Sequence, residues 1–105
     1  MATVSLPNKI FAGVLTDVEE QIYTVLAGET DVITSATLCN LTDAAQTASV
    51  KFGGVYFFKD VDLAPRQVTV LDFKQVLSAG DAIVVGASNP DAVSLFLSSV
   101  KITVI

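Results

Sequence analysis

The sequence predicts an all-β protein: a single-domain antiparallel β-sandwich, jelly-roll-like, with about eight strands. Three observations support this. The β-branched residues Val, Ile and Thr are abundant, turn residues separate short apolar runs about every ten positions, and no stretch has convincing helical periodicity. Many short strands without helices are typical of sandwiches and jelly rolls.

The chain divides into an expected extended N-terminal arm, residues 1–9, and a β-sandwich domain, residues 10–105. Pro7 disfavours a helix within the arm. The expected strands, in order, are Ile10–Leu15, Glu20–Leu26, Asp31–Leu41, Thr47–Phe52, Val55–Phe58, Gln67–Phe73, Lys74–Leu77, Ala82–Ala87 and Val93–Ile105.

Turn residues lie between these strands. Gly28 suits the turn after the second strand and Gly53-Gly54 the turn after the fourth, because glycine tolerates positive φ. Residues 59–65 are expected to form a loop, and residues 88–91 (SNPD) are a strong turn signal. The segment 42–46 is expected to be a loop as well.

The sequence predicts that the strands differ in how many of their faces are exposed to water. Residues 47–52 alternate between apolar and polar side chains, which indicates one wet face. The aromatic run at Tyr56–Phe58 places large side chains on both faces, with Tyr56 and Phe58 on the same side. Cover for the second face would come from a neighbouring subunit or from a loop that folds back. In the last strand the apolar parity switches at residues 97–99, which predicts a β-bulge or a crossing between sheets.

Composition favours association with other macromolecules. Of the 105 residues, 51% are hydrophobic and 16% are charged, against about 25% charged in ordinary domains. A small domain with so few charges exposes apolar area or buries it against a partner. The net charge is −5, and the six basic residues are scattered singly. We therefore expect neither nucleic-acid binding nor attachment to an anionic membrane.

No constellation of residues predicts catalysis. The chain lacks histidine, the commonest general base and metal ligand, and contains neither phosphate-loop nor dinucleotide fingerprint. Asp60 and Asp62 are possible ligands for a hard cation, but a solvated loop explains them better. Cys39 is expected to be a buried thiol. We expect no catalytic residue, no metal and no cofactor.

Four segments resemble a known family: residues 22–30 (IYTVLAGET), 33–40 (ITSATLCN), 70–72 (VLD) and 76–83 (VLSAGDAI). The pattern resembles small β-sandwich structural proteins in the virions of tailed bacteriophages, over residues 22–105. Leu26 departs from it, since family members often have proline there. The family carries no catalytic residues. The resemblance implies a virion protein that is made in the host cytoplasm and assembled on the particle.

The leading hypothesis is a non-enzymatic capsid decoration or cement protein that stabilises the outer shell. Its expected partners are the phage major capsid protein and further copies of itself, with a trimer as the expected homo-oligomer. The candidate interface residues are Tyr56, Phe58, Pro7 and Ile10. The alternatives are a host-recognition, glycan-binding module of a tail fibre or baseplate, and a tail or connector accessory protein.

Overall fold

The computed structural model describes the backbone of residues 3–104 and the side chains of residues 9–102. This part of the chain forms eight strands and contains no helix, so none that could cross a membrane. The strands are β1 (Thr3–Val14), β2 (Glu20–Thr24), β3 (Glu29–Asn40), β4 (Gln46–Phe52), β5 (Val55–Leu63), β6 (Val68–Leu77), β7 (Ala82–Ala87) and β8 (Val93–Val104).

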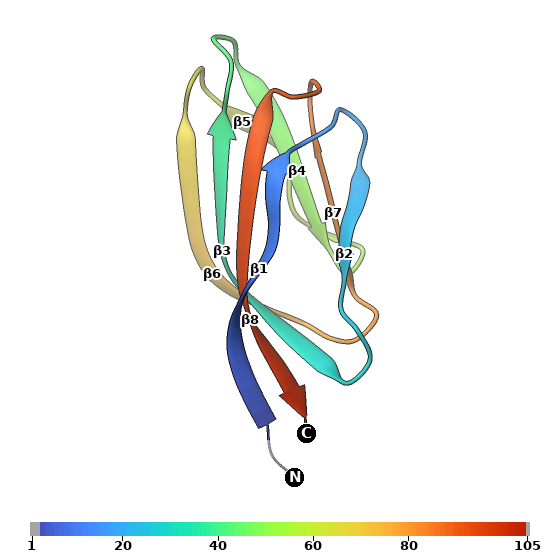
Figure 1. Ribbon diagram of the computed structural model, residues 1–105. Coiled ribbons are helices and arrows are strands. Elements are labelled where there is room, and N and C mark those ends of the chain that lie inside the picture. The colour runs from blue at the N-terminus through green and yellow to red at the C-terminus, as the bar shows by residue number, and fades with distance from the viewer. Residues whose placement is uncertain (1–2, 105) are drawn as a thin grey trace.

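The strands form two antiparallel four-stranded sheets. The first sheet has the order β1-β8-β3-β6 and the second the order β2-β7-β4-β5. Within them β1 pairs with β8, β2 with β7, β3 with β6, and β4 with β5. This is the pairing of one long hairpin rolled up into two layers, which is the jelly-roll arrangement. Figure 1 shows the two layers. The predicted all-β sandwich of about eight strands is confirmed.

The hydrophobic core lies between the two sheets. Alternate residues of each strand point into it, as the pleat of a strand requires. On β8 these are Val93, Leu95 and Leu97, and on β4 they are Ala48 and Val50, all of them buried. One face of each sheet is used in this way, and the other forms an outer face of the molecule.

Two expected strand boundaries were wrong. The predicted loop at residues 59–65 is largely strand, because β5 continues to Leu63 and pairs with β4. Its charged residues are compatible with this, since β5 is an edge strand and charges protect an exposed edge. The strands expected at Gln67–Phe73 and Lys74–Leu77 are the single strand β6.

The residues expected to form an N-terminal arm continue directly into the first strand. From Thr3 onward they belong to β1 and pair with β8. The expected boundary at residue 9 coincides with a register shift between Lys9 and Phe11. Paired along this length, β1 and β8 extend together past the rest of the sandwich, and both chain ends lie at that end of the molecule (Figure 1).

The irregularity expected in the last strand lies instead in its neighbours. The register shift is between Lys9 and Phe11 in β1, and between Ile33 and Ser35 in β3, while the β8 residues opposite them are consecutive. In the structure β8 alternates without interruption. Ser99 points into the core and is buried, whereas Val100 points away from the core, so the change of apolar parity in the sequence does not mark a bulge in β8.

Candidate interaction surfaces

Tyr56 lies on the outer face of the second sheet, in a cluster of charged groups. It pairs across the ladder with Lys51, and its hydroxyl donates a hydrogen bond of 2.6 Å to Oε2 of Glu19. The ammonium groups of Lys51 and Lys59 lie 4.8 Å and 5.0 Å from the ring centroid. The hydrogen bond to Glu19 raises the pKa of Tyr56, because it favours the neutral phenol beside a carboxylate. Tyr56 is therefore part of a polar surface and not of an apolar patch.

Phe58 does not share this face with Tyr56. It pairs with Val50, whose side chain is in the core, and it is half-buried against the core cluster. The parity argument failed here because the β4–β5 ladder shifts register on both sides of Val50. The expectation that Tyr56 and Phe58 point the same way was wrong; their assignment to an interface stays a prediction.

The other two candidate interface residues are on β1. Ile10 is at the register shift and packs, partly buried, against the core. The side chain of Pro7 lies outside the described residues, and its backbone is paired with Val100. The structure thus places Tyr56 on the outer face of the second sheet and turns Phe58 and Ile10 toward the core, so it does not bring these three candidates together.

A broad surface that the sequence analysis missed is the outer face of the first sheet. On β8 the residues between the buried leucines point outward, and Phe96 is 43% exposed. At the β6 edge Val68 and Val70 are 59% and 58% exposed. The sequence contained a signal for this outer face, because in an alternating strand Val68 and Val70 lie on the same side as the charged residues Asp72 and Lys74. What the sequence did not show is which strands lie beside β6 in the sheet.

The cross-strand pairings arrange these outward residues in rows that cross all four strands. Two adjacent rows contain no charged residue, and we call them the uncharged rows. The first row is Val14, Ser94, Cys39 and Val68, and the second is Ala12, Phe96, Thr37 and Val70. Cys39 is half-buried in the first of them, so the expectation of a fully buried thiol was wrong.

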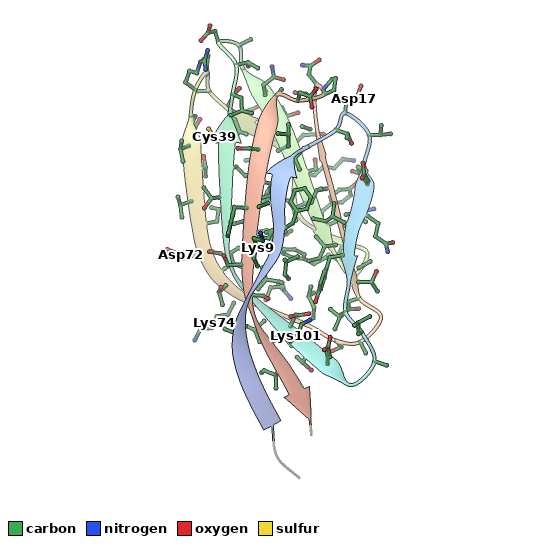
Figure 2. The ribbon with its side chains drawn as sticks, in the orientation of Figure 1. Lys9, Asp17, Cys39, Asp72, Lys74 and Lys101 are labelled. Atoms are coloured by element: carbon green, nitrogen blue, oxygen red, sulfur yellow. The ribbon has the colours of Figure 1, made fainter. Side chains whose placement is uncertain are left out.

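The row next to them carries a charge at each end. It consists of Lys9, Ser98, Ser35 and Asp72. Lys9 is on the edge strand β1 and Asp72 on the opposite edge strand β6 (Figure 2). Lys74, the next outward residue on β6, is the remaining charge among the described outward positions of these strands. A face this poor in charge costs little to desolvate.

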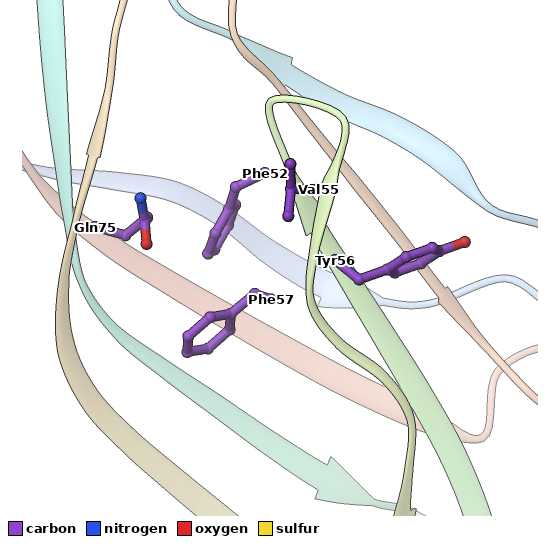
Figure 3. Close-up of a pocket in the computed structure, with 5 residues that line it drawn as sticks. All are labelled: Phe52, Val55, Tyr56, Phe57 and Gln75. Atoms are coloured by element: carbon purple, nitrogen blue, oxygen red, sulfur yellow. The ribbon is translucent and has the colours of Figure 1, made fainter.

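A small pocket lies between the sheets at the tip of the β4–β5 hairpin (Figure 3). It has a volume of about 160 Å³ and is lined by Phe52, Val55, Tyr56, Phe57 and Gln75. The ring of Phe57 packs against Phe73 at a centroid distance of 4.5 Å, and so covers the edge of the core there. Aromatic rings beside an amide are able to hold a small, partly apolar ligand.

A second hollow, of about 190 Å³, lies over the second sheet and is acidic. Its lining includes Asp17, Glu19, Asp60 and Ser49. The hydroxyl of Ser49 accepts a hydrogen bond of 2.8 Å from the Asp60 amide. Within the described residues no three acidic or sulfur-bearing side chains are arranged to hold a metal ion. Asp60 lines this hollow, whereas Asp62 does not.

Comparison with known proteins gives a likeness of fold. No protein-family model matches the chain, and no curated protein matches it. Among solved structures, a chain from "Structure of infectious bursal disease virus Gx strain" superposes on 99% of this chain with a TM-score of 0.56 and 10% sequence identity. This chain spans 33% of the length of that viral chain. At this identity the likeness is one of fold alone.

Proposed function

We propose that this protein is a non-enzymatic structural component of a virus particle. Within that class we propose a capsid decoration or cement protein of a tailed bacteriophage, which binds the major capsid protein and itself. The observation that carries the proposal is the pair of uncharged rows on the outer face of the first sheet. A rigid jelly roll with a weakly charged flat face suits adhesion. The fold likeness to a chain of a virus structure agrees with it.

The proposed mechanism is adhesion without chemistry. Burying apolar surface contributes about 25 cal/mol per Å², and the uncharged rows bring no buried charge that would oppose this. The protein would be made in the host cytoplasm and would act on the virion, where further contacts between shell subunits resist heat and salt. No nucleic acid, membrane or cofactor enters this mechanism.

The test compares phage particles with and without the protein. We expect the chain to be present in many copies on the capsid of wild-type particles, and particles from a deletion strain to lose their genome at a lower temperature. Adding the purified protein back should restore the wild-type temperature. Deletion particles of unchanged heat and salt resistance, together with absence of the protein from wild-type capsids, would refute the proposal.

A second candidate function is recognition of host glycans by a tail fibre or baseplate. The observation in its favour is the aromatic pocket at the β4–β5 tip, where Phe57 and Gln75 provide a ring and a hydrogen-bonding amide. Binding of the purified protein to host surface polysaccharides, lost in Phe57→Ala, would favour this function. A cement protein should show no such binding. A role as a tail or connector accessory would instead locate the protein in tail fractions.

A further inference from the structure

One row on the outer face of the first sheet has a charge pattern that is complementary to itself, and Lys74 lies outside this row. The row next to the uncharged rows has Lys9 at the β1 edge and Asp72 at the β6 edge. Between them are only the hydroxyl side chains of Ser98 and Ser35. A cation and an anion at opposite ends of one row can each meet the other end of an identical row.

The symmetry that achieves this is a two-fold axis parallel to the strands, between β8 and β3. Rotation about that axis lays a second copy face to face on the first, with its β6 over β1 and its β1 over β6. Each row then meets its own copy. Lys9 faces Asp72 of the second copy, and Asp72 faces Lys9, so the contact is isologous and closed. A two-fold axis across the strands, through this row, would instead place Lys9 against Lys9.

The size of the face suits such a contact. With the next outward row, which contains Val100, Val32 and Val76, the face has four rows and spans eight residues along each strand. Four strands about 4.8 Å apart and eight residues about 3.4 Å apart give a footprint of roughly 500 Å² per copy. Two copies would bury about 1,000 Å², the lower bound for a specific interface. Face-to-face packing of sheets is also the packing already used inside the sandwich.

We infer that this protein forms a two-fold homodimer through the outer face of the first sheet, with the uncharged rows at its centre and Lys9–Asp72 ion pairs at both edges. The inference deepens the proposed function by assigning the uncharged rows to the contact of the protein with itself, which leaves other surfaces for the shell, and it rests on that function for its purpose. Pairing is measured on the isolated chain, whereas shell binding is measured on particles. A failure of one is therefore distinguishable from a failure of the other.

The first experiment measures solution mass against protein concentration by light scattering or sedimentation. We expect the mass to rise to twice the 11.0 kDa of the chain. Val70→Asp should weaken pairing by a factor of about ten or more, because it buries an unpaired charge in the second uncharged row. The matched control is Val55→Asp, at a valine on the hairpin tip that is 71% exposed against 58% for Val70, and it should leave the mass unchanged. Circular dichroism verifies that both variants are folded.

A charge exchange tests the orientation of the two copies. Lys9→Glu alone would place two carboxylates opposite each other, and Asp72→Lys alone would place two ammonium groups opposite each other. Each single variant should therefore weaken the dimer. The double variant Lys9→Glu/Asp72→Lys restores opposite charges and should recover most of the affinity. Both positions in this design are exposed on the folded chain, so unfolding does not mimic the pattern.

The single cysteine supplies an independent measurement. Cys39 lies in an uncharged row and would be covered in the dimer. We expect its rate of reaction with a bulky maleimide to fall as protein concentration rises, and Val70→Asp to abolish that dependence. A monomer at all concentrations, a stable trimer, or a dimer insensitive to Val70→Asp would each overturn the inference. Failure of the double charge exchange to recover affinity would overturn the two-fold orientation. The trimer predicted from the sequence is thus tested in the same experiment.

Discussion

The outer faces of the two sheets enclose the same core but differ in the charged groups that they expose to solvent. On the second sheet, Lys51 and Lys59 lie against the ring of Tyr56, and Glu19 accepts the hydrogen bond of its hydroxyl. Nζ of Lys51 also lies 3.7 Å from Oε1 of Glu19. On the first sheet, eight outward positions in two adjacent rows carry no charge.

This difference between the outer faces concerns the proposed association and not the stability of the fold. Exposed ion pairs contribute little to stability, so the charges of the second sheet serve mainly to keep that face in water. The core residues of both sheets supply the stability. The first sheet does not need an apolar outer face in order to fold, and we therefore assign that face to the proposed association.

The largest expected effect on the free energy of unfolding comes from comparing substitutions on the two sides of a single strand of the first sheet. Leu38 points inward from β3 and is 0% exposed, whereas its neighbour Thr37 points outward in an uncharged row. We expect Leu38→Ala to lower the free energy of unfolding by about 3 kcal/mol, through lost burial and the cavity that remains. Thr37→Ala should change it by about 0.5 kcal/mol or less. Urea unfolding of the two variants measures both values, and equal losses would contradict the assignment of faces.

A somewhat smaller effect is expected where the two sheets are joined at one end. Asn40, at the end of β3, is buried, and its Nδ2 lies within 3.2 Å of the carbonyl oxygens of Ala44, Leu63 and Ala64. Its Oδ1 accepts hydrogen bonds from the amide and the hydroxyl of Thr42. This one side chain therefore ties the first sheet to the end of β5 in the second.

We expect Asn40→Ala to cost about 2 kcal/mol, because buried carbonyl and amide groups lose their partners. The control is Leu41→Ala, at the next residue, which is exposed and should have little effect. Thermal or urea unfolding gives both values. A loss for Asn40→Ala no larger than that for the control would show that water replaces the side chain in these hydrogen bonds.

The sequence predicted the class of fold well because its signals are local. Alternation and turn residues indicated the strands, and glycines with positive φ mark two of the sharp turns, at residue 28 and at residues 53–54. Two features depended on pairing and were missed. The register shifts around Val50 turned Tyr56 and Phe58 to different faces, and the pairing of β5 with β4 turned an expected loop into strand.

The same reason explains why the candidate surface was not predicted. The uncharged rows join residues from four strands that are far apart in the sequence, such as Val14, Phe96 and Val70. Their adjacency follows from the sheet order, which alternation within one strand does not reveal. The sequence analysis predicted instead that Tyr56 and Phe58 would mark an interface. In the structure Phe58 packs against the core, and other rings, those of Phe52, Phe57 and Phe73, pack against one another at its edge.

A smaller effect, on pH dependence, concerns the tyrosine between the sheets. The hydroxyl of Tyr23 donates a hydrogen bond of 2.6 Å to Asp31, which is fully buried. Burial and the neighbouring Asp31 carboxylate raise the pKa of Tyr23 above its ordinary value of 10.0. In the range between the unfolded and folded pKa values the native state binds more protons, so stability falls as pH rises.

The stabilising contribution of Tyr23 should therefore be complete below pH 10 and be lost as the pH rises through the pKa of the folded state. Tyr23→Phe removes the titrating group, so its stability should fall less steeply over that alkaline range. Urea midpoints measured at neutral and alkaline pH test this. An equally steep alkaline decline in Tyr23→Phe would assign the decline to other groups, such as the neighbouring Lys101, whose ammonium lies 6.0 Å from the ring of Tyr23.

The smallest expected effect concerns the matching tyrosine on the charged outer face. Tyr56 also donates a hydrogen bond of 2.6 Å to a carboxylate, that of Glu19, but in an exposed setting where water competes for both groups. We expect Tyr56→Phe to leave the unfolding midpoint and the solution mass unchanged within error. A clear loss of stability would mean that the second sheet depends on its surface network. A changed mass would mean that copies associate through the charged face, and the contrast between the two outer faces would then no longer explain how the protein assembles.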